Sequence, residues 1–128
     1  MENNRDIKVL LAEDNKINQR IMTLTFKQMG VKCDVASNGK EALEMHQKNL
    51  YNLILMDMQM PLMDGLEASR LIREFEKETK QPKRVYIVAL TGNDISDKEE
   101  ECLKAGMDDF MEKPLQANLL TKLFSRSY

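Results

Sequence analysis

The sequence has little of what holds small secreted domains together. It contains only two cysteines, Cys33 and Cys102, and its polar start, Met1–Asp6, lacks the apolar run of a signal peptide. Two isolated cysteines fit reduced thiols better than a disulfide framework. We therefore expect a soluble domain of the reducing cytoplasm, with both thiols unpaired.

Long apolar runs and an excess of basic charge are also missing. The apolar runs are only a few residues long, too short to cross a bilayer. The 19 basic residues are balanced by 21 acidic ones, for a net charge of −2. Because binding to nucleic acid needs a basic face, we expect no nucleic-acid partner and no membrane contact by this domain.

What remains is the composition of an ordinary globular domain. Of the 128 residues, 42% are hydrophobic and 31% charged, which suits a single domain over 1–128 with 1–6 as a polar tail. The only histidine, His46, has no companion ligands near it in the sequence. We interpret it as a surface or partly buried side chain and not as a metal ligand.

Short apolar runs alternate with longer amphipathic segments along the chain. The runs that predict buried strands are Ile7–Ala12, Leu53–Met56 and Val85–Leu90, while Val31–Val35 predicts a half-buried strand and Asp109–Met111 a short one. The segments that predict helices are Asn15–Met29, Asn38–Lys48, Leu66–Phe75, Ser96–Ala105 and Gln116–Phe124. We expect the charged connection Glu76–Arg84 to be solvated. Such β-α repeats favour a parallel sheet with helices on both faces.

Polar side chains follow four of the five predicted strands. Glu13 and Asp14 follow the first strand, Asp57 the third, Thr91 the fourth and Lys113 the fifth. In an open parallel sheet, ligands bind beyond the carboxyl ends of the strands. We therefore expect these side chains to meet at one edge.

These residue types fit the transfer of a phosphoryl group. Clustered carboxylates suit Mg²⁺, which prefers oxygen ligands. A carboxylate can act as the nucleophile and form an aspartyl phosphate, and a lysine and a hydroxyl can each meet a phosphoryl oxygen. Taken singly, Asp57 is most simply a loop residue or helix cap, and Lys113 a surface lysine. It is their coincidence at one edge that favours a site.

Four segments carry a resemblance to a known family. They are VLLAEDN (Val9–Asn15), LILMDMQMPLMDG (Leu53–Gly65), VALTG (Val88–Gly92) and FMEKPL (Phe110–Leu115). Over nearly its whole length the chain resembles the receiver domains of response regulators in two-component signalling. The particular residues of these segments are similar to those in receivers of hybrid histidine kinases. The resemblance implies a flavodoxin-like α/β fold of three layers, (βα)5, with a parallel five-stranded sheet in the order 2-1-3-4-5.

The resemblance also implies roles at the metal. Asp57 is the phosphoacceptor, and Mg²⁺ is the only cofactor implied. Asp14 and Asp57 bind the ion directly, Glu13 acts through water, and Gln59 offers its backbone carbonyl.

Further implied roles concern the phosphoryl group and the switch. The residues implied to contact the phosphoryl group are Thr91, Gly92, Lys113 and Met58. Lys113 precedes a cis bond to Pro114. Thr91 and Phe110 form a switch pair, although Phe110 can equally be a plain core aromatic. Gln59 and Asn93 tune the lifetime of the phosphoryl group.

The implied partner is a histidine kinase or a histidine phosphotransfer domain. If exposed, apolar positions near Asn15 and Ile17 could dock a helix of such a donor. We favour a packing role for the methionines around Pro61.

Two other functions are weighed against this one. Phosphatases of the haloacid-dehalogenase type usually carry a second aspartate two residues after the nucleophile, where this chain has Gln59. A non-catalytic module such as an FMN-binding flavodoxin relative lacks support, because no Ser/Thr-rich loop follows the first strand. Whether the domain counts as an enzyme is left open, since it would catalyse its own phosphorylation and dephosphorylation.

Overall fold

The computed structural model describes residues 7–92 and 98–128. Its strands are β1 (Val9–Ala12), β2 (Cys33–Ala36), β3 (Leu53–Asp57), β4 (Tyr86–Thr91) and β5 (Asp109–Glu112). They form one parallel sheet in the order β2-β1-β3-β4-β5, which confirms the predicted order. Asp57 and Thr91 are the last residues of their strands, one position further than the sequence pattern predicted.

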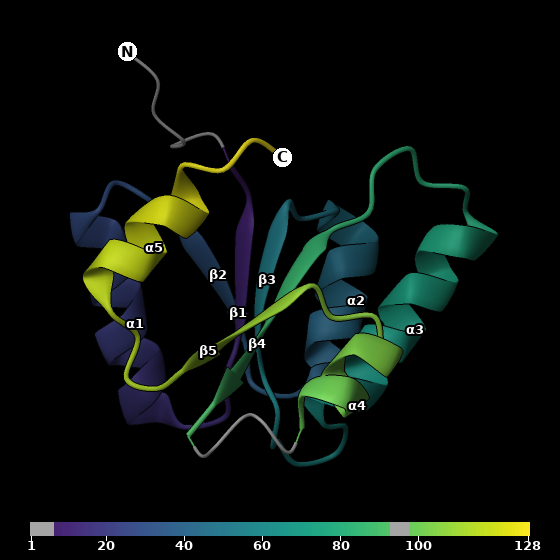
Figure 1. Ribbon diagram of the computed structural model, residues 1–128, viewed down its shortest axis with the longest axis horizontal. Coiled ribbons are helices and arrows are strands. Elements are labelled where there is room, and N and C mark those ends of the chain that lie inside the picture. The colour runs from purple at the N-terminus through teal and green to yellow at the C-terminus, as the bar shows by residue number, and fades with distance from the viewer. Residues whose placement is uncertain (1–6, 93–97) are drawn as a thin grey trace.

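The helices cover both faces of the sheet (Figure 1). They are α1 (Lys16–Gln28), α2 (Gly39–Asn49), α3 (Gly65–Glu78), α4 (Glu99–Lys104) and α5 (Ala117–Phe124). Helices α1 and α5 lie on one side, and α2, α3 and α4 on the other (Figure 1). The result is the predicted three-layer α/β architecture.

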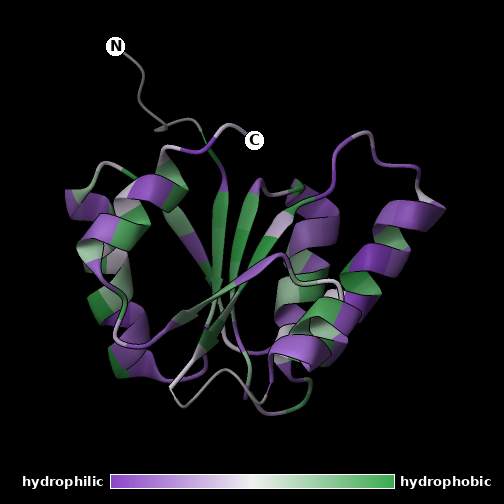
Figure 2. Cartoon of the chain, viewed as in Figure 1, coloured by the Kyte–Doolittle hydropathy of each residue, from purple (hydrophilic) through white to green (hydrophobic). Residues whose placement is uncertain are grey.

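The central strands are buried on both faces. Every residue of β1 and β3 is buried. Leu10 and Ala12 join the core under α2, α3 and α4, whereas Val9 and Leu11 join the core under α1 and α5. Because successive side chains of a strand point to opposite faces, a doubly covered strand must be apolar throughout. The hydropathy colouring shows this contrast between strands and outer helix faces (Figure 2).

Polar caps begin three of the helices directly after strands or turns. The side chains of Asn15, Asn38 and Asp64 each accept a hydrogen bond from a backbone N–H three residues on. Such caps satisfy N–H groups that have no partner within the helix. For α4, the expected start at Ser96 lies outside the described residues, and Lys98 is the N-cap of the described helix, without a side-chain cap bond.

The expectation of a solvated connection from Glu76 onward is wrong at its start. Helix α3 continues to Glu78, and Glu76 is buried. Its carboxylate pairs with Arg73 at 2.8 Å and accepts a hydrogen bond from the Val85 N–H. These partners compensate the buried charge.

The expectation of an exposed or partly exposed His46 is also wrong. His46 is 2% exposed, and its ring packs near those of Tyr51 and Phe75. Its Nδ1 accepts a hydrogen bond from the Tyr51 N–H at 3.1 Å. The histidine is therefore a core residue between α2 and α3.

Helix α1 buries two apolar residues and leaves three others exposed. Met22 and Phe26 are its buried residues. Ile17, Ile21 and Leu24 are 71%, 58% and 51% exposed. The helix thus presents an apolar stripe to the outside. None of the helices in the described ranges has the length and apolar character that crossing a bilayer requires.

Candidate functional site

Three carboxylates meet at the carboxyl edge of the sheet. Oxygens of Glu13, Asp14 and Asp57 all lie within 4.8 Å of one another. The cause is the parallel register of β1 with β3, which sets Ala12 beside Met56 and so brings the following residues together. Glu13 and Asp57 are buried, at 1% and 7% exposed, whereas Asp14 is exposed.

Lys113 compensates the two buried carboxylates. Its Nζ lies 3.0 Å from Glu13 Oε1 and 3.0 Å from Asp57 Oδ2. The Lys113 N–H also donates to the carbonyl of Thr91 at 2.7 Å, which fixes the chain just beyond β5. The peptide bond between Lys113 and Pro114 is cis, in agreement with the prediction. The contact of Lys113 with Glu13 was not foreseen from the sequence.

Burial and the neighbouring polar groups have opposite effects on the pKa values of Asp57 and Lys113. Burial raises the pKa of Asp57 above its ordinary value of 3.8, while the hydrogen bonds from Lys113 and Gln59 act to lower it. Burial alone would lower the pKa of Lys113, but the hydrogen bonds to Asp57 and Glu13 outweigh it and raise that pKa. Lys113 therefore stays charged, and the Asp57 carboxylate is more basic than a surface carboxylate.

The segment after β3 folds back over the end of the strand. The Gln59 N–H donates to Asp57 Oδ1 at 3.2 Å, and the Gly65 N–H donates to the Met58 carbonyl at 3.2 Å. Gly65 lies so close to the Asp57 carbonyl that a Cβ on it would overlap that oxygen. The sequence pattern predicts a helix only from Leu66 and assigns Gly65 no role, whereas the structure makes Gly65 the first residue of α3. A glycine directly before a predicted helix, a residue that marks turns and close backbone approaches, was the available signal.

The remaining predicted residues surround this centre. Thr91, which is buried, lies one residue beyond Leu90, the β4 partner of Asp57. Gly92 is exposed, and a Cβ there would meet nothing within 4 Å. Gln59 is exposed and Met58 is buried. The Met58 N–H donates to the Leu90 carbonyl at 3.2 Å.

Of the last two predicted residues, the structure describes only Phe110. Phe110 is half-buried and packs against the core under α2, α3 and α4. It therefore fits both readings considered for it, switch and core aromatic. Asn93 lies outside the described residues.

The donor set fits a hard dication. All three clustered groups offer carboxylate oxygens, and none is a histidine or cysteine. Oxygen ligands alone favour Mg²⁺ or a similar ion over softer metals. A carboxylate cluster at a strand edge, with a lysine and a threonine beside it, can hold a dication and a phosphoryl group together.

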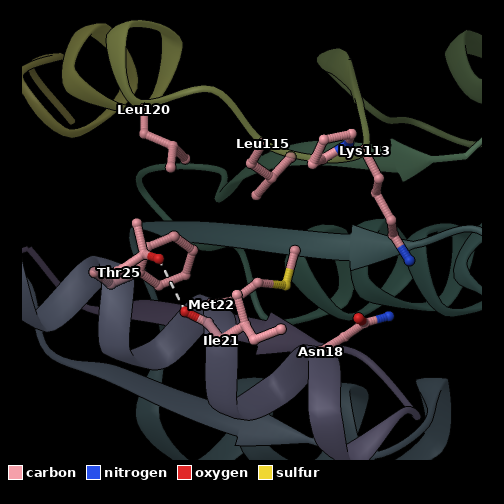
Figure 3. A pocket seen from close by; sticks show the side chains of 9 residues that line it. Asn18, Ile21, Met22, Thr25, Lys113, Leu115 and Leu120 are labelled. Atoms are coloured by element: carbon pink, nitrogen blue, oxygen red, sulfur yellow. Dashed lines mark hydrogen bonds between the residues drawn. The ribbon is translucent and has the colours of Figure 1, made fainter.

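A groove of about 360 Å³ lies beside this centre, between α1 and the β5–α5 connection. Ile21, Met22, Leu115 and Leu120 line it. The Lys113 side chain lies at one end of the groove, and its ammonium group points away from the apolar residues Leu115 and Leu120 (Figure 3). The site therefore continues into an apolar surface.

Comparison with known proteins decides the family. The model of the response regulator receiver domain matches residues 9–125. The chain belongs to this family. The receiver is 44% identical over 117 residues to hybrid signal transduction histidine kinase K of Dictyostelium discoideum, covering 89% of this chain but 10% of that protein. It spans between 6% and 11% of the length of this and two further hybrid kinases of that organism.

Solved receivers have the same fold. The receiver of Ssk1 from Saccharomyces cerevisiae, crystallised with the histidine phosphotransfer protein Ypd1, superimposes with a TM-score of 0.86 at 34% identity, covering 92% of this chain and 86% of that one. The receiver of the histidine kinase CKI1 from Arabidopsis thaliana, complexed with Mg²⁺, gives 0.80 at 36% identity, covering 93% and 92%. These likenesses confirm the flavodoxin-like fold class predicted from the sequence.

Proposed function

We propose that this receiver, as a single domain over 1–128, accepts a phosphoryl group from phosphohistidine onto Asp57 in a Mg²⁺-dependent reaction and relays a two-component signal. The observation that carries the proposal is the buried Asp57 carboxylate, which shares the Lys113 ammonium with Glu13 at 3.0 Å each. This arrangement holds a basic carboxylate ready beside a cation that can move to an incoming phosphoryl oxygen.

The step balances without an added base. A carboxylate oxygen of Asp57 attacks phosphorus, and the new O–P bond forms as the N–P bond of phosphohistidine breaks. The electron pair of the broken bond stays on the imidazole nitrogen. A ring that enters protonated on its other nitrogen therefore leaves as neutral imidazole.

The acidic cluster would hold the metal. Asp14 and Asp57 supply direct ligands, Glu13 acts through water, and the Gln59 backbone carbonyl completes the protein set. When bound, Mg²⁺ neutralises charge on the phosphoryl oxygens.

The phosphoryl group would lie among Thr91, Gly92, Lys113 and Met58. Lys113 turns from Asp57 to a phosphoryl oxygen, and the Thr91 hydroxyl meets another. The open space beside Gly92 leaves room on that side.

Two further roles follow the same reaction. Movement of the Thr91 hydroxyl would change the rotamer of half-buried Phe110, and so the surface of α4, β5 and α5. The amides of Gln59 and Asn93 would set how readily water reaches the acyl phosphate.

The donor would be a histidine kinase or a histidine phosphotransfer domain in the cytoplasm. The exposed stripe Ile17, Ile21 and Leu24 on α1 offers it an apolar docking face beside the acidic cluster. The solved complex of the similar Ssk1 receiver with Ypd1 supports this class of partner. By its likeness to hybrid kinases, the receiver would serve as one module of such a protein.

Intact mass spectrometry with phosphoramidate tests the site. We expect one phosphoryl adduct on the wild type in Mg²⁺, none in chelator, and none on Asp57→Asn. Phosphoramidate needs no docking surface, so the result depends on the site alone. If Asp57→Asn formed the adduct at the wild-type rate, the acceptor would be a residue other than Asp57.

A further inference from the structure

Leu62, in the turn between β3 and α3, combines two unfavourable properties. It is 85% exposed, more than any other large hydrophobic side chain in the described ranges. Its φ is +69°, a backbone region that L-residues with a side chain seldom adopt. The strained backbone lowers the stability of the fold, and the exposed side chain buries no apolar surface that would offset this cost.

The turn itself explains the backbone strain. The Met63 N–H donates to the Pro61 carbonyl at 2.7 Å, which closes a three-residue turn around Leu62. With a positive φ at its centre, this is the rare and strained form of γ-turn. Glycine would fit this position without strain, because it has no Cβ.

Neighbouring residues show that packing is not the reason for the leucine. Met60 and Met63 are partly buried against the core under α2, α3 and α4, as the sequence suggested for this loop. Leu62 is not among the residues that pack against either described core. The isobutyl group therefore contributes little to the fold.

The loop is nevertheless held in place. The Gly39 N–H donates to the Met63 carbonyl at 2.9 Å, which ties the loop to the start of α2. The Gly65 N–H closes its other end on Met58. Leu62 is thus presented from a fixed turn between the end of β3 and the start of α3, a helix that covers the opposite face of the sheet from α1 (Figure 1).

We propose that Leu62 is a specificity-determining contact, which packs on an apolar surface of the protein phosphodonor as its phosphohistidine approaches Asp57. This inference rests on the proposed function. Together with the stripe on α1, it adds an exposed apolar contact in the turn that follows Asp57. An exposed apolar side chain held at such a position is suited to an intermolecular contact.

Three substitutions separate contact from strain. Leu62→Ala removes the contact and keeps the strained backbone, whereas Leu62→Gly removes both. Leu62→Met keeps an apolar side chain of similar size. Lys80→Asn is the control for strain relief alone, because Lys80 also has a positive φ, of 53°, and lies between α3 and the start of β4.

Phosphoryl transfer from phosphorylated Ypd1 and from phosphoramidate would be timed for each variant. With Ypd1 we expect a loss of about tenfold for both Leu62→Ala and Leu62→Gly, from the apolar area removed. Leu62→Met and Lys80→Asn should match the wild type, and all rates with phosphoramidate should be unchanged. In thermal unfolding, Leu62→Gly should melt at or above the wild-type temperature and above Leu62→Ala.

The outcomes are distinguishable. Equal Ypd1 rates for wild type, Leu62→Ala and Leu62→Gly, including no transfer to any of them, would overturn the role of Leu62. A failure of the wild type to react with phosphoramidate would instead overturn the proposed function.

Discussion

At the scale of single residues, the fit of Gly65 against Asp57 decides where the acceptor sits. A Cβ at Gly65 would overlap the Asp57 carbonyl and approach Met56 Cγ to 2.9 Å. The backbone of a central strand cannot yield as a flexible side chain can. Any side chain at position 65 must therefore push the start of α3 away from β3.

We expect Gly65→Ala to lower the free energy of unfolding by about 1–3 kcal/mol, the usual cost of overpacking. Urea denaturation measures this. The displaced loop should also slow phosphorylation by phosphoramidate, because the Gln59 N–H would lose its alignment with Asp57. Gly92→Ala is the matched control for stability, since a Cβ there meets nothing within 4 Å. Equal stability of the two variants would contradict the assigned role.

At this scale, the sequence identified those site residues that lie at the carboxyl ends of predicted strands. Asp57 and Thr91 could be singled out because they follow buried runs in a β-α pattern. The shared contact of Lys113 with Glu13 could not, because it joins residues 100 positions apart through side-chain conformations. The strained backbone at Leu62 could not be predicted either, since a positive φ does not change the hydrophobic pattern of the sequence.

At the scale of elements, a network of ion pairs joins α3 to the start of β5. Arg73 contacts Glu76 and Asp108, each at 2.8 Å, and its Nε–H donates to the Gly106 carbonyl. Asp108 in turn accepts a hydrogen bond from the Ile87 N–H at the start of β4. One guanidinium therefore holds together a helix and the entrances to two strands.

Arg73→Met should cost about 3–5 kcal/mol of unfolding free energy, because it leaves the buried Glu76 carboxylate without its cation and leaves Asp108 paired with Arg84 alone. Chemical denaturation checks this. Lys104→Met is the control, since it removes only the exposed pair with Glu100 and should change little. A loss of under about 1 kcal/mol for Arg73→Met would show that the network adds nothing beyond a surface pair.

This network also explains why the end of α3 was misjudged. Glu76 looks like a solvated charge in the sequence, because periodicity assigns charged residues to the outer face. Its burial depends on Arg73 three residues earlier and on the Val85 N–H. By contrast, the starts of α1 and α2 were placed correctly by Asn15 and Asn38, whose capping is a local property.

At the scale of the whole molecule, His46 links global stability to pH. Burial lowers the pKa of His46 below its ordinary value of 6.5, with Glu76 acting to raise it and Arg73 to lower it. Protonation would also remove the acceptor that Nδ1 offers to the Tyr51 N–H. The unfolded chain therefore takes up this proton first as the pH falls.

It follows that stability from neutral His46 is fully present above pH 6.5 and is lost as the pH falls toward its lowered pKa. We expect the free energy of unfolding of the wild type to fall more steeply below pH 6.5 than that of His46→Gln. Urea titrations of both proteins in chelator, at several pH values, would show it. Parallel pH profiles would contradict this role.

The overall architecture was the most predictable level. Five apolar runs separated by amphipathic segments are enough to predict a parallel sheet covered on both faces. The strand order came from the family resemblance, because hydrophobic patterns do not say which strands are neighbours. Whether a residue such as His46 is buried depends on the packing of the whole fold, so the hydrophobic pattern alone does not predict it.

The link between Glu13 and Lys113 has a consequence for biosynthesis. Lys113 is among the last residues of the domain to leave the ribosome, long after Glu13 and Asp57. Until it arrives, an emerging chain that closes β1 against β3 holds two carboxylates together without their ammonium, a costly state. Competence to accept a signal and relief of this charge therefore come together, once the segment that carries Lys113 has been synthesised.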